Sequence, residues 1–362
     1  MSTDCSAGAA PWPGPLAISA LGAATCFGGM TTAAAAARAG LSRARDLPDL
    51  TYVDDKSKES TSASGSPIVG VTDGFEGAGR LGRMSALAVE ELTSAADWVH
   101  PRRLQCFLAL PAMTEDEARL VGQSLARALG APADLVHVHA FGHRGTGRAL
   151  REAAEALRAG RCDHAVVGAC DSWVDAVRLQ QIADVGRLKT LNHPVGFTPG
   201  EAAAFLLLER PRAAGGGRRP PDALLTDVRE EIEENNHAAD RPLTGRALAR
   251  LLLATLGQGD RGTLYLDLNG EEFRAADWGM ALVRAQSARD LGGWARKMPA
   301  ASFGDTGVAL SILAAGLATR AFARGYAVGD RALVIVSGEG PERLALVIER
   351  PPAAATALGA RG

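Results

Sequence analysis

The sequence predicts a layered α/β fold built from two similar halves. Two segments of the 362-residue chain end alike: FTPGEAAAFLLLERP at Phe197–Pro211 and RLALVIERP at Arg343–Pro351. Each ends in an apolar strand, and each follows an Ala-rich helical segment and an earlier strand. A recurring unit of two strands and a helix with the same ERP ending indicates a duplicated α/β unit. The preceding helix and strand are Gly145–Ala159 and Asp163–Ala169 in the first copy, and Thr306–Arg324 and Arg331–Ser337 in the second.

This repeat divides the chain into an N-terminal half, residues 1–211, and a C-terminal half, residues 223–351. Residues 212–222 are rich in Gly, Arg and Pro and are predicted to link the halves, because such a segment cannot pack. The polar segment 54–67 is predicted to be a mobile surface loop, and residues 352–362 a flexible tail.

Strand and helix patterns alternate along both halves, which favours a layered α/β fold with mostly parallel pairing. Thr114 and Glu117 are predicted to form a capping box at the start of a helix that runs to Leu129. The other expected elements are strands at Leu16–Ala24, Leu104–Leu110, Leu135–Phe141 and Thr263–Leu268, and helices at Thr31–Arg38 and Thr244–Leu256.

Composition excludes several classes of protein. The net charge of −2 argues against a nucleic-acid or anionic-membrane partner. The first residues do not have the pattern of a signal peptide, and no apolar run approaches the roughly 20 residues of a membrane span, so neither feature is expected. Its five cysteines are scattered and are expected to be reduced thiols, which predicts a cytoplasmic protein. No cofactor is expected.

Several motifs together resemble one family. The opening ISALGAATCFGG is followed by an Ala-rich helix, a D-x-A-x-x-G strand, and a loop to F-x-x-G-E-x-A that leads into a strand ending in L-E. Later in the chain come YLDLNG, SFGDTG and SGEG. In this order the motifs resemble the β-ketoacyl synthases of the thiolase fold. The resemblance implies an αβαβα architecture with two mixed five-stranded sheets, and a homodimer that forms through a strand of the first half.

The family's catalytic residues do not carry over. Its members use a Cys nucleophile at a strand-to-helix turn, where the helix dipole lowers the thiol pKa, and two histidines from the C-terminal half. The matching positions here are His143, Asn269 and Asp305. No cysteine lies between Cys106 and Cys162, and all seven histidines precede residue 238. Lys297 lies too far upstream to match the family's lysine.

The resemblance therefore implies a ketosynthase-like protein without condensing activity. Such a protein would be a non-catalytic subunit, an adaptor or an acyl-binding protein, with an acyl carrier protein or a secretion effector as its partner. Degenerate members of the family occur as accessory proteins, including beside type VI secretion effectors. One alternative is an enzyme with altered chemistry, decarboxylation or thioester hydrolysis, through His143. Another, on the family resemblance alone, is an acyltransferase of the 3-oxoacyl-[acyl-carrier-protein] synthase type.

Three sets of polar residues have more than one interpretation. His143 is either a base held neutral at a helix N-terminus or a residue that has drifted in an unused site. His137, His139 and His143 spell H-x-H-x-x-x-H, but buried histidines with backbone partners are commoner than a metal site. The acids and arginine of NGEEFR, which are Glu271, Glu272 and Arg274, form either a partner or ligand contact or a solvated loop with a capping residue.

Overall fold

Each half of the chain folds into a five-stranded α/β unit. The computed structural model describes residues 11–53, 57–96, 103–190, 193–211 and 220–352. The first half contains β1 (Leu16–Thr25), α1 (Met30–Arg38), β2 (Arg45–Val53), β3 (Ser60–Gly65), α2 (Gly77–Ala95), β4 (Leu104–Ala109), α3 (Glu115–Leu129), β5 (Val136–His139), α4 (His143–Arg158), β6 (His164–Ser172), α5 (Ala176–Asp184) and β7 (Glu201–Glu209).

The second half contains β8 (Ala223–Ile232), α6 (Arg246–Thr255), β9 (Gly262–Leu266), α7 (Glu272–Gln286), β10 (Trp294–Lys297), α8 (Ala300–Phe303), α9 (Ala309–Ala323), β11 (Arg331–Ser337) and β12 (Glu342–Glu349). Two short 3-10 turns, η2 (Ala133–Leu135) and η3 (His237–Ala239), complete the described elements.

The two halves have the same strand order. The large sheet runs β10-β9-β11-β12-β8-β1-β7-β6-β4-β5. The strands β2 and β3 form a separate two-stranded sheet, which leaves five strands of each half in the large sheet. Numbered in chain order, these five strands lie side by side in the order first, fifth, fourth, second, third in both halves. In both halves the fourth strand is parallel to the second and antiparallel to the fifth. This shared order and direction confirm the predicted duplication.

The strands differ from the expectation in two respects. The pairing is mixed, as the family resemblance implies, and not mostly parallel as the alternation of elements favoured, because the first and fifth strands of each half join the sheet antiparallel. The two five-stranded units are also hydrogen-bonded into one sheet, because the start of β1, Leu16–Ile18, pairs with Ala223–Leu225 of β8. On its other side, β1 pairs with β7 from Ala17 to Thr25.

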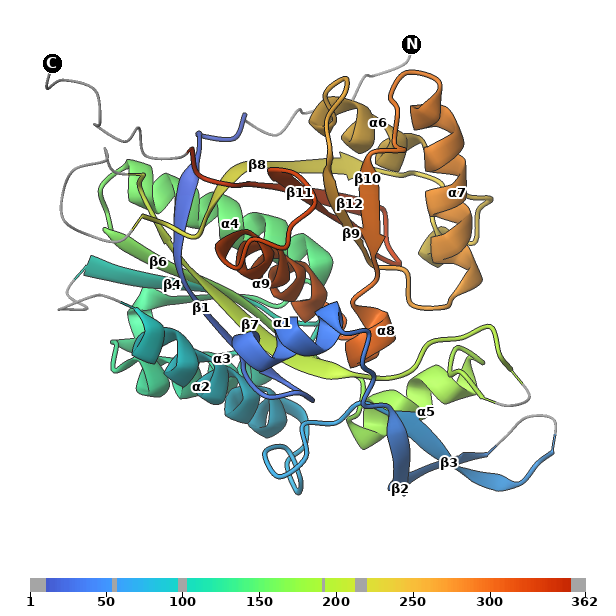
Figure 1. The fold of residues 1–362 in the computed structure, drawn as a ribbon. Helices are drawn as coiled ribbons and strands as arrows, with labels where there is room; N and C mark the ends of the chain where they lie inside the picture. Colours follow the sequence, from blue (N-terminus) through green and yellow to red (C-terminus); the bar gives the residue numbers. More distant parts are fainter. Residues whose placement is uncertain (1–10, 54–56, 97–102, 191–192, 212–219, 353–362) are drawn as a thin grey trace, which may run out of the picture.

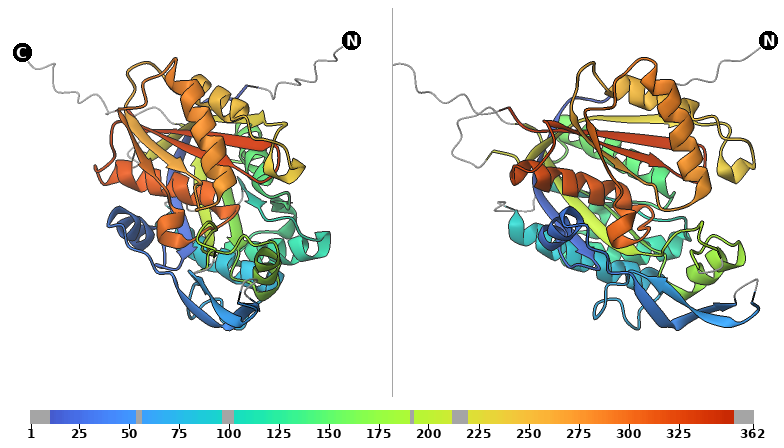
Figure 2. Two further views of the ribbon diagram at one scale, coloured as in Figure 1. Left: turned by 90° about the vertical axis from the view of Figure 1, so that its right-hand side faces the viewer. Right: turned by 45° about the vertical axis from the view of Figure 1, so that its right-hand side comes forward.

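Helices cover both outer faces and fill the middle of the molecule (Figure 1). The pair α2 and α3 packs on the first half, and the pair α6 and α7 packs on the second. The central helices α4 and α9 each contact strands of both halves. The layers are therefore α, β, α, β, α, as predicted, and the two turned views show the same stacking (Figure 2).

The central helix α9 is apolar around almost its whole circumference. Every residue of α9 except Arg320 and Ala323 is buried. A helix that is hydrophobic all round belongs in the interior of a protein. Its many small side chains allow it to lie close to the neighbouring strands.

Glycine allows the closest approach between a helix and a strand in the first half. A Cβ built on Gly22 of β1 would lie 2.0 Å from the backbone oxygen of Ala88 in α2. Similarly, a Cβ on Gly168 of β6 would lie 2.0 Å from the ring of Phe205 in β7. These positions therefore accept no larger residue without a shift of the packed elements.

The capping box that the sequence predicts is present. The Thr114 hydroxyl accepts a hydrogen bond from the Glu117 N–H at 3.3 Å, and the Glu117 carboxylate accepts one from the Thr114 N–H at 3.0 Å. Helix α3 begins directly after Thr114 and ends at Gly130, whose φ of 62° is left-handed.

The prediction of a mobile loop over 54–67 is wrong for Ser60–Gly65, which form β3 and pair with β2. Ala63 is 1% exposed and packs with Tyr52, Leu179 and Ile182, so a single buried alanine fixes this polar strand to α5. Of the predicted linker and tail, residues 212–219 and 353–362 lie outside the described residues. In the part of the chain that is described, no helix has both the length and the apolar character to cross a membrane.

Two Gly→Ala substitutions should change stability in opposite directions. Gly22→Ala should lower the free energy of unfolding by about 1 to 3 kcal/mol, because the methyl group is forced into α2. Gly279→Ala in α7 should raise it by up to about 1 kcal/mol, since a Cβ there meets no atom within 4 Å and alanine favours helix. Urea unfolding of both variants measures the difference, and equal effects would contradict this packing.

Candidate functional site

The three residues that the sequence resemblance singled out, His143, Asn269 and Asp305, lie where the two halves meet. His143 is the first residue of α4, which follows the third strand of the first half. Asp305 lies just before α9, the helix that follows the third strand of the second half. The two residues therefore occupy related places in the duplicated fold. Asn269 follows β9, the strand that lies between β10 and β11.

Asn269 and Asp305 are hydrogen-bonded to each other. The Asn269 amide donates to Asp305 Oδ2 at 2.5 Å and to Glu271 Oε2 at 2.8 Å. The Asn269 carbonyl accepts the N–H of Glu271 at 3.0 Å, and Asp305 Oδ1 accepts the N–H of Gly307 at 2.7 Å. Both polar side chains are thus engaged within the protein.

A buried arginine lies beside this pair. Arg274 of α7 is 4% exposed and contacts the carboxylates of Asp267, Glu271 and Asp305. It also donates to the backbone oxygen of Ser337 at 3.0 Å. Burial alone would lower the pKa of Arg274, but the surrounding carboxylates raise it above its ordinary value. The guanidinium therefore keeps its positive charge, and three carboxylates lie close to it.

A second arginine comes from the other half of the chain. Arg187 follows α5, and its guanidinium binds both oxygens of Glu271, at 2.6 and 3.1 Å. It also lies 2.7 Å from Glu339 in the turn between β11 and β12. Burial acts to raise the pKa of Glu339, but its contact with Arg187 brings that pKa below the ordinary value. Arg187 thus joins two loops of the second half to the first half.

His143 faces this cluster. A Cβ on Gly338 would lie 3.2 Å from the His143 ring, so the loop after β11 packs against the imidazole of this partly exposed residue. Within the described residues, His143 Nδ1 is buried without a hydrogen-bond partner. Burial lowers the pKa of His143, and the charge of Arg274 lowers it further, against the opposing effect of Asp267, Asp305 and Asp171. The ring is neutral at pH 7, as the sequence suggests, but burial is the main cause rather than the helix dipole.

The expectation of an exposed contact loop is wrong for two of its three residues. Glu271 and Arg274 are 5% and 4% exposed and belong to the buried charge cluster. Glu272, the first residue of α7, is exposed. Charged residues in a loop usually contact solvent. Here the carboxylate of Glu271 and the guanidinium of Arg274 are buried, and they neutralise each other.

The three histidines of the H-x-H-x-x-x-H pattern have separate surroundings. His137 stacks on Phe107 with ring centroids 4.9 Å apart. His139 Nε2 lies 3.0 Å from Glu152 Oε2 of α4. Among the described residues, no three His, Cys, Asp or Glu side chains are placed to hold a metal ion.

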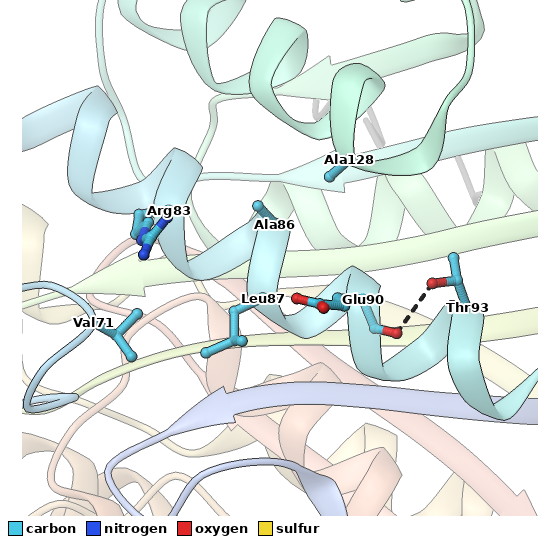
Figure 3. A pocket seen from close by; sticks show the side chains of 7 residues that line it. All are labelled: Val71, Arg83, Ala86, Leu87, Glu90, Thr93 and Ala128. Atoms are coloured by element: carbon cyan, nitrogen blue, oxygen red, sulfur yellow. Dashed lines mark hydrogen bonds between the residues drawn. The ribbon is translucent and has the colours of Figure 1, made fainter.

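A surface depression of about 370 Å³ lies elsewhere, on the outer layer of the first half (Figure 3). Most of its lining residues belong to α2, and none is a residue singled out from the sequence. They are Val71, Arg83, Ala86, Leu87, Glu90, Thr93 and Ala128.

Sequence reasoning missed the residues that complete the cluster. Asp267 lies in the YLDLNG motif, just after β9 and two residues before Asn269. Alternate side chains of an extended segment point to the same side, so this spacing could have predicted that Asp267 lies near Asn269. Arg187 and Glu339 have no local pattern that marks them, because they meet only in the folded chain.

We predict that Arg274 and Glu272 differ sharply in their effect on stability. Arg274→Ala should lower the free energy of unfolding by about 3 to 5 kcal/mol, because it leaves buried carboxylates without a partner. Glu272→Ala should change it by no more than about 0.5 kcal/mol, because that side chain is exposed. Chemical denaturation checks both variants, and a mild Arg274→Ala would show that the cluster contributes little.

Stability should also decrease in mild acid. The pKa values of His143 and His139 are lowered in the folded chain, chiefly by burial, so the unfolded chain binds protons more readily below pH 6.5. The free energy of unfolding should fall there, by at most about 1.4 kcal/mol per pH unit for each histidine. His143→Gln should reduce this slope, and His193→Gln, at an exposed position, serves as the control. An unchanged slope in His143→Gln would contradict the assignment.

Comparison with known proteins identifies the fold. No protein-family model matches the sequence, and no curated protein matches it. Among solved structures, one similar chain is from the complex AntDE:AntF, a type II polyketide synthase acyl-carrier protein with its ketosynthase bound to the hexaketide. The TM-score is 0.75 at 15% identity, with 94% of this chain and 100% of that chain covered.

Two other similar structures are single ketosynthase domains. The OzmH ketosynthase domain KS7 of the Streptomyces albus oxazolomycin system has a TM-score of 0.74 at 17% identity, with 94% of this chain and 75% of that chain covered. The ketosynthase from module 6 of the bacillaene synthase of Bacillus subtilis has a TM-score of 0.72 at 12% identity, with 93% and 72% covered. Across nearly its whole described length, this chain has the thiolase-like fold of the ketosynthases.

Proposed function

We propose that this protein is a ketosynthase-like protein that does not condense acyl groups and acts as a non-catalytic subunit, adaptor or acyl-binding protein. One observation carries the proposal. Asn269 and Asp305, which match the family's two histidines, bind each other within a cluster of buried charges. The assignment of these positions rests on the sequence resemblance.

The chemistry of condensation supports the proposal. A condensing enzyme needs a thiolate nucleophile, and at its two histidine positions it needs imidazoles that polarise the thioester. At position 143 this chain has a neutral imidazole instead of a thiol. Asn269 donates its amide hydrogens to carboxylates, and Asp305 is an acceptor already bound to donors. Neither side chain is available to assist a thioester.

An enzyme with altered chemistry at His143 is the second candidate, and one observation favours it. His143 Nδ1 is buried without a partner among the described residues, and its lowered pKa keeps the ring in the neutral form that a general base requires. A neutral ring nitrogen without a partner can accept a proton, so the reactions to consider are decarboxylation and thioester hydrolysis through His143. An acyltransferase of the 3-oxoacyl-[acyl-carrier-protein] synthase type has only the resemblance in its favour.

We propose three features of its assembly and setting. An acyl-carrier protein is one partner class, because the AntDE:AntF structure holds such a protein with its ketosynthase; a secretion effector is the other. A cytoplasmic location suits Cys26, Cys106, Cys162 and Cys170, which are all free and buried. A homodimer is proposed through β5, which lies at the edge of the large sheet with one side open to another strand.

Condensation should be absent in the wild type and in His143→Cys. With acyl- and malonyl-loaded acyl carrier protein, mass spectrometry should detect no β-ketoacyl product above a no-protein control. His143→Cys should at most react with a thiol-directed acyl probe, since Asn269 and Asp305 still lack imidazoles. Product from either protein would overturn the proposal. Hydrolysis of the acyl thioester that is lost in His143→Ala would instead support the altered-chemistry candidate.

The dimer should depend on the surface beside β5. Phe141 follows this strand and is 59% exposed, so Phe141→Ser should shift the mass measured by light scattering from dimer towards monomer. Val328→Ser, at a 46% exposed position in the segment between α9 and β11, is the matched control and should leave the mass unchanged. A monomeric wild type would rule out the proposed dimer.

A further inference from the structure

The side chain of Arg187 lies at the outer end of the charge cluster. Its backbone is fixed on both sides: its N–H donates to Ile182 at the end of α5, and its carbonyl accepts the N–H of Phe197, at 2.9 and 3.0 Å. The guanidinium is therefore the part of the residue that can reorient. Rotation about its side-chain bonds would move it away from the cluster while the backbone stays in place.

The surroundings of this guanidinium have the features of a guanidinium-binding site. Glu271 binds it with both oxygens, and Glu339 binds it from the other side at 2.7 Å. The rings of Phe197 and Phe273 lie 5.4 and 5.9 Å from its central carbon. Two-pronged carboxylate binding together with aromatic faces suits the planar arginine group and does not suit a lysine ammonium.

The cluster becomes more buried from Arg187 towards His143. The Glu339 and Arg187 side chains are 39% and 16% exposed, whereas Glu271 and Asp305 are 5% and 6% exposed. Gly338, the neighbour of Glu339, packs against the His143 ring. Arg187 and Glu339 thus form the solvent side of the cluster.

Removal of the Arg187 guanidinium would leave Glu339 without its ion-pair partner, whereas Glu271 would keep its contacts with Arg274 and Asn269. The two carboxylates would then repel each other, and the half-exposed Glu339 would attract water. The turn between β11 and β12 would lose its tie to Arg187 and move away from the start of α7. Since Gly338 of this turn packs against the His143 ring, more of this partly exposed residue would become accessible to solvent.

We propose that Glu271, Glu339, Phe197 and Phe273 form a guanidinium-binding site that Arg187 fills within the chain, and that this guanidinium acts as a plug by holding the turn between β11 and β12 against His143. The ligand class of the site is a guanidinium group, as carried by an arginine side chain. The inference deepens the proposed function and rests on it for its biological role, because a plugged site suits a protein that does not turn over acyl groups. Its test measures access to position 143 and not condensation, so the two proposals can fail separately.

Access to position 143 can be measured with a reporter cysteine. His143→Cys is treated with N-ethylmaleimide, and mass spectrometry of the peptide that contains residue 143 gives its labelling rate. The double variant His143→Cys/Arg187→Ala should label about tenfold faster or more, because labelling follows the population of the open form. His143→Cys/Arg148→Ala is the matched control, since Arg148 is exposed and pairs with Glu152 on the same helix.

Guanidinium ion tests the ligand class. In His143→Cys/Arg187→Ala, guanidinium chloride far below denaturing concentrations should slow the labelling again, whereas the same concentration of sodium chloride should not. Adding Glu271→Gln should abolish this protection, because one of the two carboxylates loses its charge. Protection by both salts alike, or none by guanidinium, would overturn the binding site.

Folding is checked by thermal unfolding of each variant. If Arg187→Ala does not fold, Arg187→Lys takes its place; it keeps the charge but loses the two-pronged contact, and it should label faster than the control. Equal labelling rates with and without the Arg187 guanidinium would overturn the plug.

Discussion

The buried positive charge of Arg274 is the constraint on which the rest of the site depends. A guanidinium in the interior of a protein must be surrounded by acceptors, because an unpaired buried charge costs far more than a hydrogen bond returns. Here it is matched by Asp267, Glu271 and Asp305, which come from the ends of different elements. One arginine therefore fixes how the loops after β9, α8 and β11 approach each other.

This charge balance bears directly on function. In the ketosynthase resemblance, the same loops carry groups that act on a thioester, and they must remain free to do so. For a thiol placed at position 143, burial and the nearby carboxylates would raise the pKa, whereas the charge of Arg274 would lower it. Arg187 extends the same pairing to the surface and connects the two halves of the chain. The central loops of the duplicated fold thus bind one another.

The sequence predicted the fold well because the fold depends on repeated local patterns. The ERP endings, the capping box at Thr114 and the Ala-rich helices are each visible within a few residues. The site was predicted only in part: His143, Asn269 and Asp305 do come together, but Glu271 and Arg274 were expected at the surface. A charged loop looks the same in sequence whether its partner is water or a distant residue such as Arg187. The strand Ser60–Gly65 was missed for a similar reason, because its buried residues, Ala63 and Gly65, are small and stand among polar ones.

The most direct test is to restore all three family residues at once. His143→Cys/Asn269→His/Asp305→His removes the amide and the carboxylate that bind each other beside Arg274. If the loops are held together by this pairing, the triple variant should lose several kcal/mol of unfolding free energy in urea and should form no β-ketoacyl product with loaded acyl carrier protein. A triple variant that is as stable as the wild type and condenses acyl groups would contradict the account.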